Sequence, residues 1–172
     1  MSAVLLLDAD GNLFPSEEPA FEASADVTNR FLASLGVDAR YTPEYLLATT
    51  TGRNFRTTAC DLARAHGVSA EPTLDDWVAE EKAVVTAHLG RVLRPDPAVL
   101  EPLRRLARSY ELAAVSSSAL TRLDACFRAT GLAELLPARR RFSAEDSLPT
   151  PVSKPDPAVY TFALGQLGIG AE

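Results

Sequence analysis

Apolar residues follow two different patterns along the chain, and the alternation between them predicts its architecture. Residues 3–7 (AVLLL) and 111–116 (ELAAVS) are short apolar runs, and a continuous run of this kind predicts a parallel strand that is buried on both faces. Apolar residues repeat at helical spacing just before the second run, over 99–107, and just after it, over 120–127. Strands that alternate with helices predict an α/β fold with a Rossmann-like, doubly wound parallel sheet.

The segment between the first strand and residue 90 has helical patterns only. Prolines that can begin a helix and glycines that can end one divide it into four stretches. These residues are Pro19, Gly36, Pro43, Gly67, Pro72 and Gly90. We therefore predict an α/β core of residues 1–14 and 91–172 with an inserted all-helical cap of residues 15–90. The functional interpretation of the cap is a hinged cover over a site in the core; the alternative is a packing accessory.

Composition and charge exclude several classes of protein. The chain has 172 residues, 47% of them hydrophobic and 23% charged, as in ordinary globular proteins. Its net charge of −6 argues against a nucleic-acid partner, and we interpret the basic run Arg139–Arg141 as a solvated loop edge. Cys60 and Cys126 fall in helical patterns and are expected to be buried free thiols. No signal peptide or membrane segment is evident, so we expect a cytoplasmic protein without a membrane partner. The oligomeric state stays open.

Two aspartates directly follow the first apolar run. Asp8 and Asp10 are two residues apart, so both would point to one face of a strand, and Gly11 permits a tight turn after them. Two such oxygen ligands suit a hard divalent cation. The alternative is an ordinary turn without a metal, in which both carboxylates accept hydrogen bonds from backbone amides. A calcium loop of the EF-hand type is excluded, because Leu13 and Pro19 stand where that loop needs glycine and glutamate.

Three segments together resemble the motifs of the haloacid dehalogenase superfamily. LLLDADGNL (5–13) is similar to its first motif, a strand that ends in D-x-D-G. VSSS (115–118) resembles the second, a strand that ends in serine or threonine, and VSKPDPAVY (152–160) resembles the third, a lysine in a K-P-x-P setting. A helical insert directly after the first motif matches the subgroup with a helical cap, which contains phosphoglycolate phosphatase-like and β-phosphoglucomutase-like proteins.

The resemblance implies a role for each matching residue. Asp8 would be the nucleophile that forms an aspartyl-phosphate, and Asp10 the general acid and base. Ser116 and Ser117 would bind phosphate oxygens, and Lys154 would neutralise negative charge. Mg²⁺ would be held by Asp8 and by the backbone carbonyl of Asp10. An acid at position 10 favours phosphate esters over halides, because a halide needs no proton to leave.

The basic residues add two expectations. Of the 17 lysines and arginines, only Lys82 and Lys154 are lysines, which singles out Lys154. In the cap, Gly52, Arg53 and Arg56 stand at a loop-to-helix junction, where a guanidinium could bind an anionic substrate. The alternative for both arginines is a solvated surface position.

The resemblance therefore implies a Mg²⁺-dependent phosphatase for a small phosphorylated metabolite of the sugar phosphate or phosphoglycolate type. A β-phosphoglucomutase-like phosphomutase shares the same residues and is one alternative. A non-catalytic phosphate-binding module, or a truncated one, is another.

Two positions depart from the family pattern. Asn12 stands where threonine or valine is usual. The fourth motif, an acidic pair on a later strand, is not found after Lys154, and AEDS (144–147) precedes that lysine. We therefore expect the coding sequence to continue past Glu172. Without the fourth-motif strand, residues 4–7 would form an exposed apolar edge of the sheet, and magnesium binding and turnover would be weak.

Overall fold

The chain divides into two compact units. The structure is a computed structural model that describes residues 3–70 and 73–169. The core unit comprises Met1–Pro15 and Gly90–Glu172, and the helical unit comprises Ser16–Leu89. Each unit has its own buried core, so each is described by itself.

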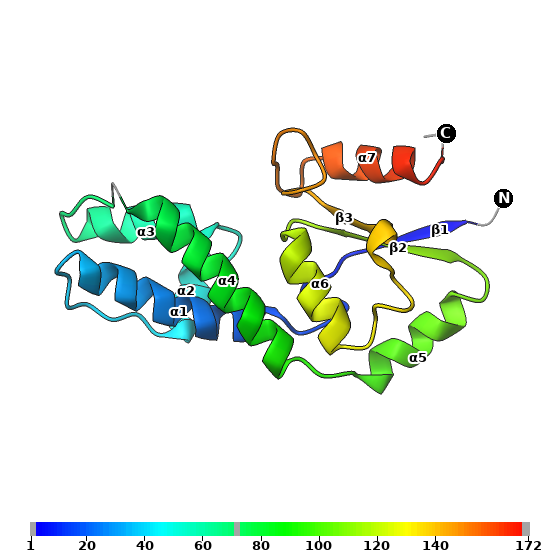
Figure 1. The fold of residues 1–172 in the computed structure, drawn as a ribbon, viewed down its shortest axis with the longest axis horizontal. Helices are drawn as coiled ribbons and strands as arrows, with labels where there is room; N and C mark the ends of the chain where they lie inside the picture. The colour runs from blue at the N-terminus through cyan, green and yellow to red at the C-terminus, as the bar shows by residue number, and fades with distance from the viewer. Residues whose placement is uncertain (1–2, 71–72, 170–172) are drawn as a thin grey trace. The chain divides into compact units, whose positions relative to one another are not determined.

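The core unit is built on a parallel sheet with helices on both faces. Its strands, in the order β1-β2-β3, are β1 (Val4–Leu7), β2 (Glu111–Ser116) and β3 (Arg141–Ser143). Its helices are α5 (Pro97–Leu106), α6 (Leu120–Ala129), the short 3-10 helix Ala138–Arg140 and α7 (Ala158–Gln166). In Figure 1, α7 lies on one side of the strands, and α5 and α6 lie on the other. The α/β fold with a parallel sheet that the sequence predicts is confirmed.

Apolar side chains from both sheet faces hold this unit together. On one face, Val159 and Ala163 of α7 belong to one buried cluster with Ala113 and Val115 of β2. Because β2 is the central strand, its residues from Leu112 to Ser116 are all buried, as predicted.

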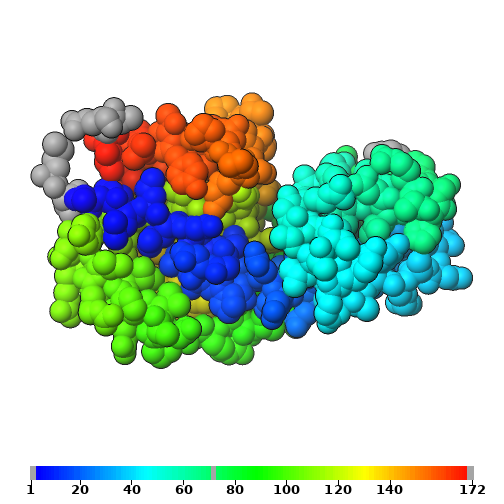
Figure 2. Space-filling view, turned by 180° about the vertical axis from the view of Figure 1, so that it is seen from behind, coloured from blue at the N-terminus to red at the C-terminus, as the bar shows by residue number. Residues whose placement is uncertain are grey.

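The first strand differs from its prediction. Val4, Leu5, Leu6 and Leu7 are all half-buried rather than buried on both faces. Among the described residues, β1 pairs with β2 alone and lies at the edge of the sheet. Figure 2 shows this blue segment at the surface, between the orange and red C-terminal part and the green segment that contains α5. A continuous apolar run therefore identified the strand but not its position in the sheet.

The basic run at 139–141 also differs from its prediction, because Arg141 is the first residue of β3 and is only 6% exposed. Its Nε donates to the carbonyl of Leu136 at 2.7 Å, and its Nη1 donates to Oδ1 of Asp124 at 3.0 Å. The guanidinium also lies 4.4 Å from the ring centroid of Phe127. Burial lowers the pKa of Arg141, and Asp124 opposes that change. A guanidinium with these partners can be buried in a position that the sequence assigns to a loop.

The helical unit contains α1 (Glu17–Ser34), α2 (Pro43–Thr50), α3 (Phe55–Ala65) and most of α4 (Leu74–Val92). Side-chain hydrogen bonds cap the N-termini of α2 and α3. The hydroxyl of Thr42 accepts from the Tyr45 amide, and Oδ1 of Asn54 accepts from the Thr57 amide. Gly36 follows the end of α1 in a left-handed conformation, with φ of +78°. Within residues 3–70 and 73–169, no helix is both long and apolar enough to cross a membrane.

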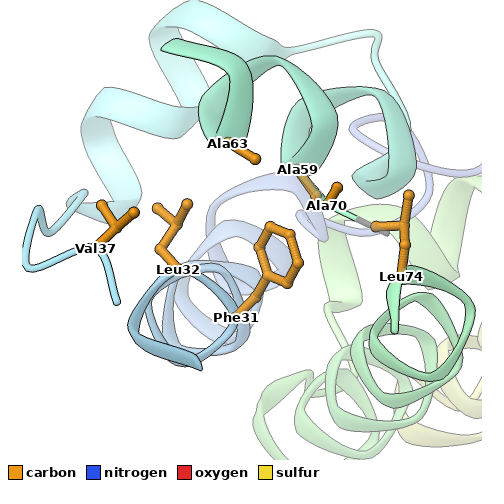
Figure 3. Close-up of a cluster of buried hydrophobic side chains, with 7 residues drawn as sticks. All are labelled: Phe31, Leu32, Val37, Ala59, Ala63, Ala70 and Leu74. Atoms are coloured by element: carbon orange, nitrogen blue, oxygen red, sulfur yellow. The ribbon is translucent and has the colours of Figure 1, made fainter. Parts of the chain in front are cut away.

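A separate apolar cluster stabilises the helical unit. Its buried members come from α1, α3, the start of α4 and the loops between helices (Figure 3), and they are Phe31, Leu32, Val37, Ala59, Ala63, Ala70 and Leu74. The ring of Phe31 is fully buried and lies 5.9 Å from that of Trp77, edge to face. Phe31 therefore anchors the packing of α1 against α4.

Replacing Phe31 should destabilise the helical unit strongly. Phe31→Ala leaves a large cavity in the cluster, and we expect it to lower the free energy of unfolding by about 3–5 kcal/mol. Trp77 is the one tryptophan of the chain and contacts Phe31, so its fluorescence during urea unfolding measures this unit. Tyr45→Ala is the control, because Tyr45 is 50% exposed, and we expect a much smaller loss. Equal losses would contradict the assignment of Phe31 to the core.

The buried thiol of Cys126 should make the core unit sensitive to alkaline pH. Burial, together with the negative charge of Asp10, raises the pKa of Cys126 from 9.0 to about 12. Below pH 9 the thiol is protonated in both states, so it adds no pH dependence. Between about pH 9 and 12 the unfolded chain loses this proton and the folded chain keeps it, so the free energy of unfolding falls as pH rises.

A comparison of two cysteine variants isolates the contribution of Cys126 to the pH dependence of the free energy of unfolding. We expect urea unfolding, followed by circular dichroism, to show a shallower alkaline fall in Cys126→Ala than in the unchanged protein. Cys60→Ala removes a half-buried thiol of the helical unit and should keep the fall. The same pH dependence in Cys126→Ala and the unchanged protein would contradict the assignment.

Candidate active site

The predicted site residues of the core unit gather at the carboxyl ends of β1 and β2. In the parallel register of these strands, Leu7 lies opposite Ala114. Asp8 therefore leaves the sheet beside the last residues of β2, and Ser116 is the last of these. Lys154 lies in the loop between β3 and α7. The fold thus brings together segments that are more than a hundred residues apart in the sequence.

Asp8 and Lys154 form an ion pair. The ammonium Nζ of Lys154 donates to Oδ1 of Asp8, and the amide of Ala9 donates to the same oxygen at 2.8 Å. The side chain of Asp8 is 52% exposed and that of Lys154 is 21% exposed. Among the described residues, both hydrogen bonds to this carboxylate end on Oδ1. Oδ2 is therefore the oxygen that could approach a ligand.

Asp10 is held by two serine hydroxyls. Ser116 donates to Oδ2 of Asp10 at 3.0 Å, and Ser118 donates to the same oxygen at 2.9 Å. Ser116 is only 1% exposed, and its hydroxyl also accepts from the amide of Ser118 at 2.9 Å. The backbone near Asp10 is fixed as well, because the Gly11 amide donates to the Phe14 carbonyl at 3.0 Å. The turn after β1 and the end of β2 are thus connected through Asp10.

The middle serine of the run contacts the loop that carries Lys154. The hydroxyl of Ser117 accepts from the backbone amide of Lys154 at 3.0 Å. Sequence reasoning assigned Ser117 to phosphate binding, and that role stays a prediction. Sequence reasoning missed Ser118, although its place in the serine run was a signal. Together the three serines connect the segments that carry Asp10 and Lys154.

An acidic residue fixes the start of α6. Oδ2 of Asp146 accepts from the amide of Leu120 at 2.6 Å. The hydroxyl of Ser143 in turn accepts from the amides of Glu145 and Asp146 at 3.1 and 3.0 Å. The AEDS segment thus holds the loop after β3 against the helix that follows the three serines.

The predicted substrate residues of the cap, Gly52, Arg53 and Arg56, belong to the helical unit. Gly52 adopts a φ of +83°. Within that unit Arg53 forms an ion pair with Asp61 at 3.1 Å, and Arg56 forms one with Asp75. Both arginine side chains are about half exposed, at 50% and 47%. Their role toward a substrate stays a prediction.

The donor set agrees with a hard cation that keeps part of its water shell. Within residues 3–70 and 73–169, no group of three or more histidine, cysteine and acidic side chains could hold a metal ion. Magnesium commonly needs only one or two carboxylates, with water and phosphate oxygens completing its shell. The carboxylate of Asp8 and the backbone carbonyl of Asp10 are the two oxygen donors that the sequence predicts for it. Nδ2 of Asn12 donates to the carbonyl of Asp8 at 3.0 Å, which steadies the turn that carries both aspartates.

Comparison with family models and with curated proteins returned no match, whereas several solved structures are similar. One is a HAD family hydrolase from Deinococcus radiodurans R1 with bound phosphate and sodium, at 27% identity and a TM-score of 0.60, over 98% of this chain and 68% of the other. CbbY from Rhodobacter sphaeroides in complex with xylulose-1,5-bisphosphate has 24% identity and a TM-score of 0.67, over 98% and 74%. A putative β-phosphoglucomutase from Thermotoga maritima has 23% identity and a TM-score of 0.63, over 100% and 73%.

These likenesses identify the fold. The chain has the fold of haloacid dehalogenase superfamily hydrolases, a Rossmann-like core with an inserted helical cap. The resemblance inferred from the three sequence motifs is confirmed at this level.

Removing the ammonium of Lys154 should weaken phosphate binding. A charge-assisted hydrogen bond to a phosphate oxygen contributes about 1.5–3 kcal/mol, so Lys154→Ala should raise the dissociation constant for inorganic phosphate about tenfold or more. Isothermal titration with phosphate in the presence of MgCl₂ measures this change. Lys82→Ala is the matched control, since Lys82 is the other lysine and lies in the helical unit. Unchanged affinity in Lys154→Ala would remove Lys154 from the proposed phosphate site.

Proposed function

We propose that the protein is a magnesium-dependent phosphatase that hydrolyses a small phosphorylated metabolite through an aspartyl-phosphate on Asp8. The observation that carries the proposal is the convergence of an exposed carboxylate, an ammonium and a buried hydroxyl at the carboxyl end of a parallel sheet. They belong to Asp8, Lys154 and Ser116. Ligands of open α/β sheets bind at this end of the strands.

Each residue has a role that follows from its contacts. Lys154 holds Oδ1 of Asp8, so Oδ2 is the oxygen that attacks phosphorus. The P–O bond to the alcohol breaks as the new bond to Asp8 forms. Asp10 gives its proton to the departing alcohol oxygen and later takes one from the water that hydrolyses the aspartyl-phosphate. Lys154 and the Ser116 hydroxyl stabilise the charge that develops on the phosphoryl oxygens.

Magnesium fits this proposal through the Asp8 carboxylate and the backbone carbonyl of Asp10. When bound, it would neutralise phosphoryl charge as a Lewis acid. The other roles are carried out by side chains of the chain itself.

The proposed substrate is a phosphate monoester of a small metabolite, of the sugar phosphate or phosphoglycolate type. Two similar proteins support this class: CbbY was solved with a sugar bisphosphate, and the Deinococcus radiodurans hydrolase with phosphate. The net charge of −6 supports a small ligand rather than a nucleic acid.

Asp8→Asn tests the proposal directly. Asparagine keeps the size of the side chain but is a poor nucleophile, so phosphate release should fall roughly a thousandfold or more. The assay is release of inorganic phosphate from a panel of sugar phosphates and phosphoglycolate with MgCl₂. Asp38→Asn, at an exposed position of the helical unit, should retain full activity.

The same panel of substrates distinguishes a phosphatase from a phosphomutase and from a non-catalytic phosphate-binding module. Activity that persists in Asp8→Asn would exclude the proposed nucleophile. Phosphoryl transfer between sugars without free phosphate would identify a phosphomutase. Magnesium-dependent binding of phosphate without turnover of any substrate would indicate a non-catalytic phosphate-binding module.

A further inference from the structure

Ser118 has a role in this site that the sequence motifs do not assign. Its hydroxyl donates to Oδ2 of Asp10 at 2.9 Å, the same oxygen that accepts from Ser116 at 3.0 Å. One carboxylate oxygen can accept both hydrogen bonds, so the two serines hold Asp10 together in the free protein. Their roles differ once a phosphate binds.

A serine hydroxyl carries a single proton. In the proposed function, Ser116 donates that proton to a phosphate oxygen of the substrate. It cannot then also donate to Asp10, so substrate binding removes one of the two hydrogen bonds to Oδ2. Ser118 still donates to Oδ2 of Asp10.

We propose that Ser118 is a positioning residue, which keeps the Asp10 side chain directed at the leaving group while the substrate occupies the Ser116 hydroxyl. The inference rests on the proposed function and adds a residue to its machinery. Ser118 does not need to touch the substrate for this role, because it acts through Asp10.

The surroundings of Ser118 fix it for this task. Its amide donates to the Ser116 hydroxyl at 2.9 Å, and the next residue, Ala119, is 4% exposed. One residue further, the start of α6 is capped by Asp146, whose carboxylate accepts from the Leu120 amide at 2.6 Å. The backbone at and just after Ser118 is thus fixed by hydrogen bonds. The Ser118 hydroxyl therefore has little freedom to follow the Asp10 carboxylate if that carboxylate moves.

A positioning role for the proton donor predicts a dependence on the leaving group. An alkyl phosphate releases an alkoxide that needs a proton, whereas a p-nitrophenyl phosphate releases a phenolate that hardly does. In Ser118→Ala, the rate of aspartyl-phosphate formation from an alkyl phosphate, measured in a single turnover, should fall about tenfold or more, while the rate of its formation from p-nitrophenyl phosphate should change less than about twofold. KM should stay nearly constant for both, because Ser118 does not bind phosphate.

Three further variants sharpen the test. Ser118→Thr retains the hydroxyl and should restore most of the alkyl-ester activity. Ser117→Ala alters the neighbouring serine, whose hydroxyl holds the Lys154 backbone, and should slow both substrates alike. In the Asp10→Asn background, Ser118→Ala should add no further loss on the alkyl ester, because both substitutions disable the same proton donor. Circular dichroism of each variant verifies folding.

The outcomes separate the inference from the function on which it rests. If the unchanged protein has no Asp8-dependent phosphatase activity, the proposed function fails, and the inference fails with it. If that activity is present but Ser118→Ala slows aspartyl-phosphate formation from both esters equally, raises KM alone, or changes neither rate of formation, only the inference is overturned. Additive losses in the double variant would overturn it as well.

Discussion

The parallel register of β1 and β2 is the constraint on which the candidate site depends. With Leu7 opposite Ala114, Asp8 leaves the sheet at the same end as Ser116. A shift of one residue would turn every side chain of β1 to the other face, so neither the Asp8–Lys154 pair nor the Asp10–Ser116 hydrogen bond could form. The apolar side chains that fix the register thus also fix the distance between groups that the sequence keeps 108 positions apart.

The three consecutive serines have identical side chains but form hydrogen bonds to different partners. Ser116 and Ser118 contact Asp10, whereas the intervening Ser117 contacts the backbone of Lys154. β2 ends at Ser116, and the backbone bends at Ser117 and Ser118 before α6 begins, which separates the three hydroxyls. Because Ser116 is buried and the other two are half-buried, these hydrogen bonds form where water competes weakly for them. The run therefore connects the segment that carries Asp10 with the segment that carries Lys154.

The sequence predicted which segments form helices and strands better than it predicted the burial and the neighbours of those segments. Helix ends were marked locally by Pro43, Gly36 and Gly67, and both long apolar runs became strands. The apolar pattern alone could not show that β1 lies at an edge, because a local pattern does not report how many neighbours a strand has; only the missing fourth-motif strand led us to expect it. Nor could it show that Arg141 is buried, since its partner Asp124 lies 17 residues away on another element. For the site, the motifs identified residue types, but the direction of the Ser117 and Ser118 hydroxyls required coordinates.

The charges of the site explain why a cation belongs in the proposed chemistry. The side chains of Asp8, Asp10 and Lys154 together carry no net positive charge, even when Asp10 holds the proton that the proposed mechanism requires. A phosphate monoester dianion approaching them would meet repulsion that the single ammonium, already paired with Asp8, cannot offset. A divalent cation reverses the sign of the local charge. The charge of these three side chains is thus itself a reason to expect that phosphate binding depends on magnesium in the proposed function.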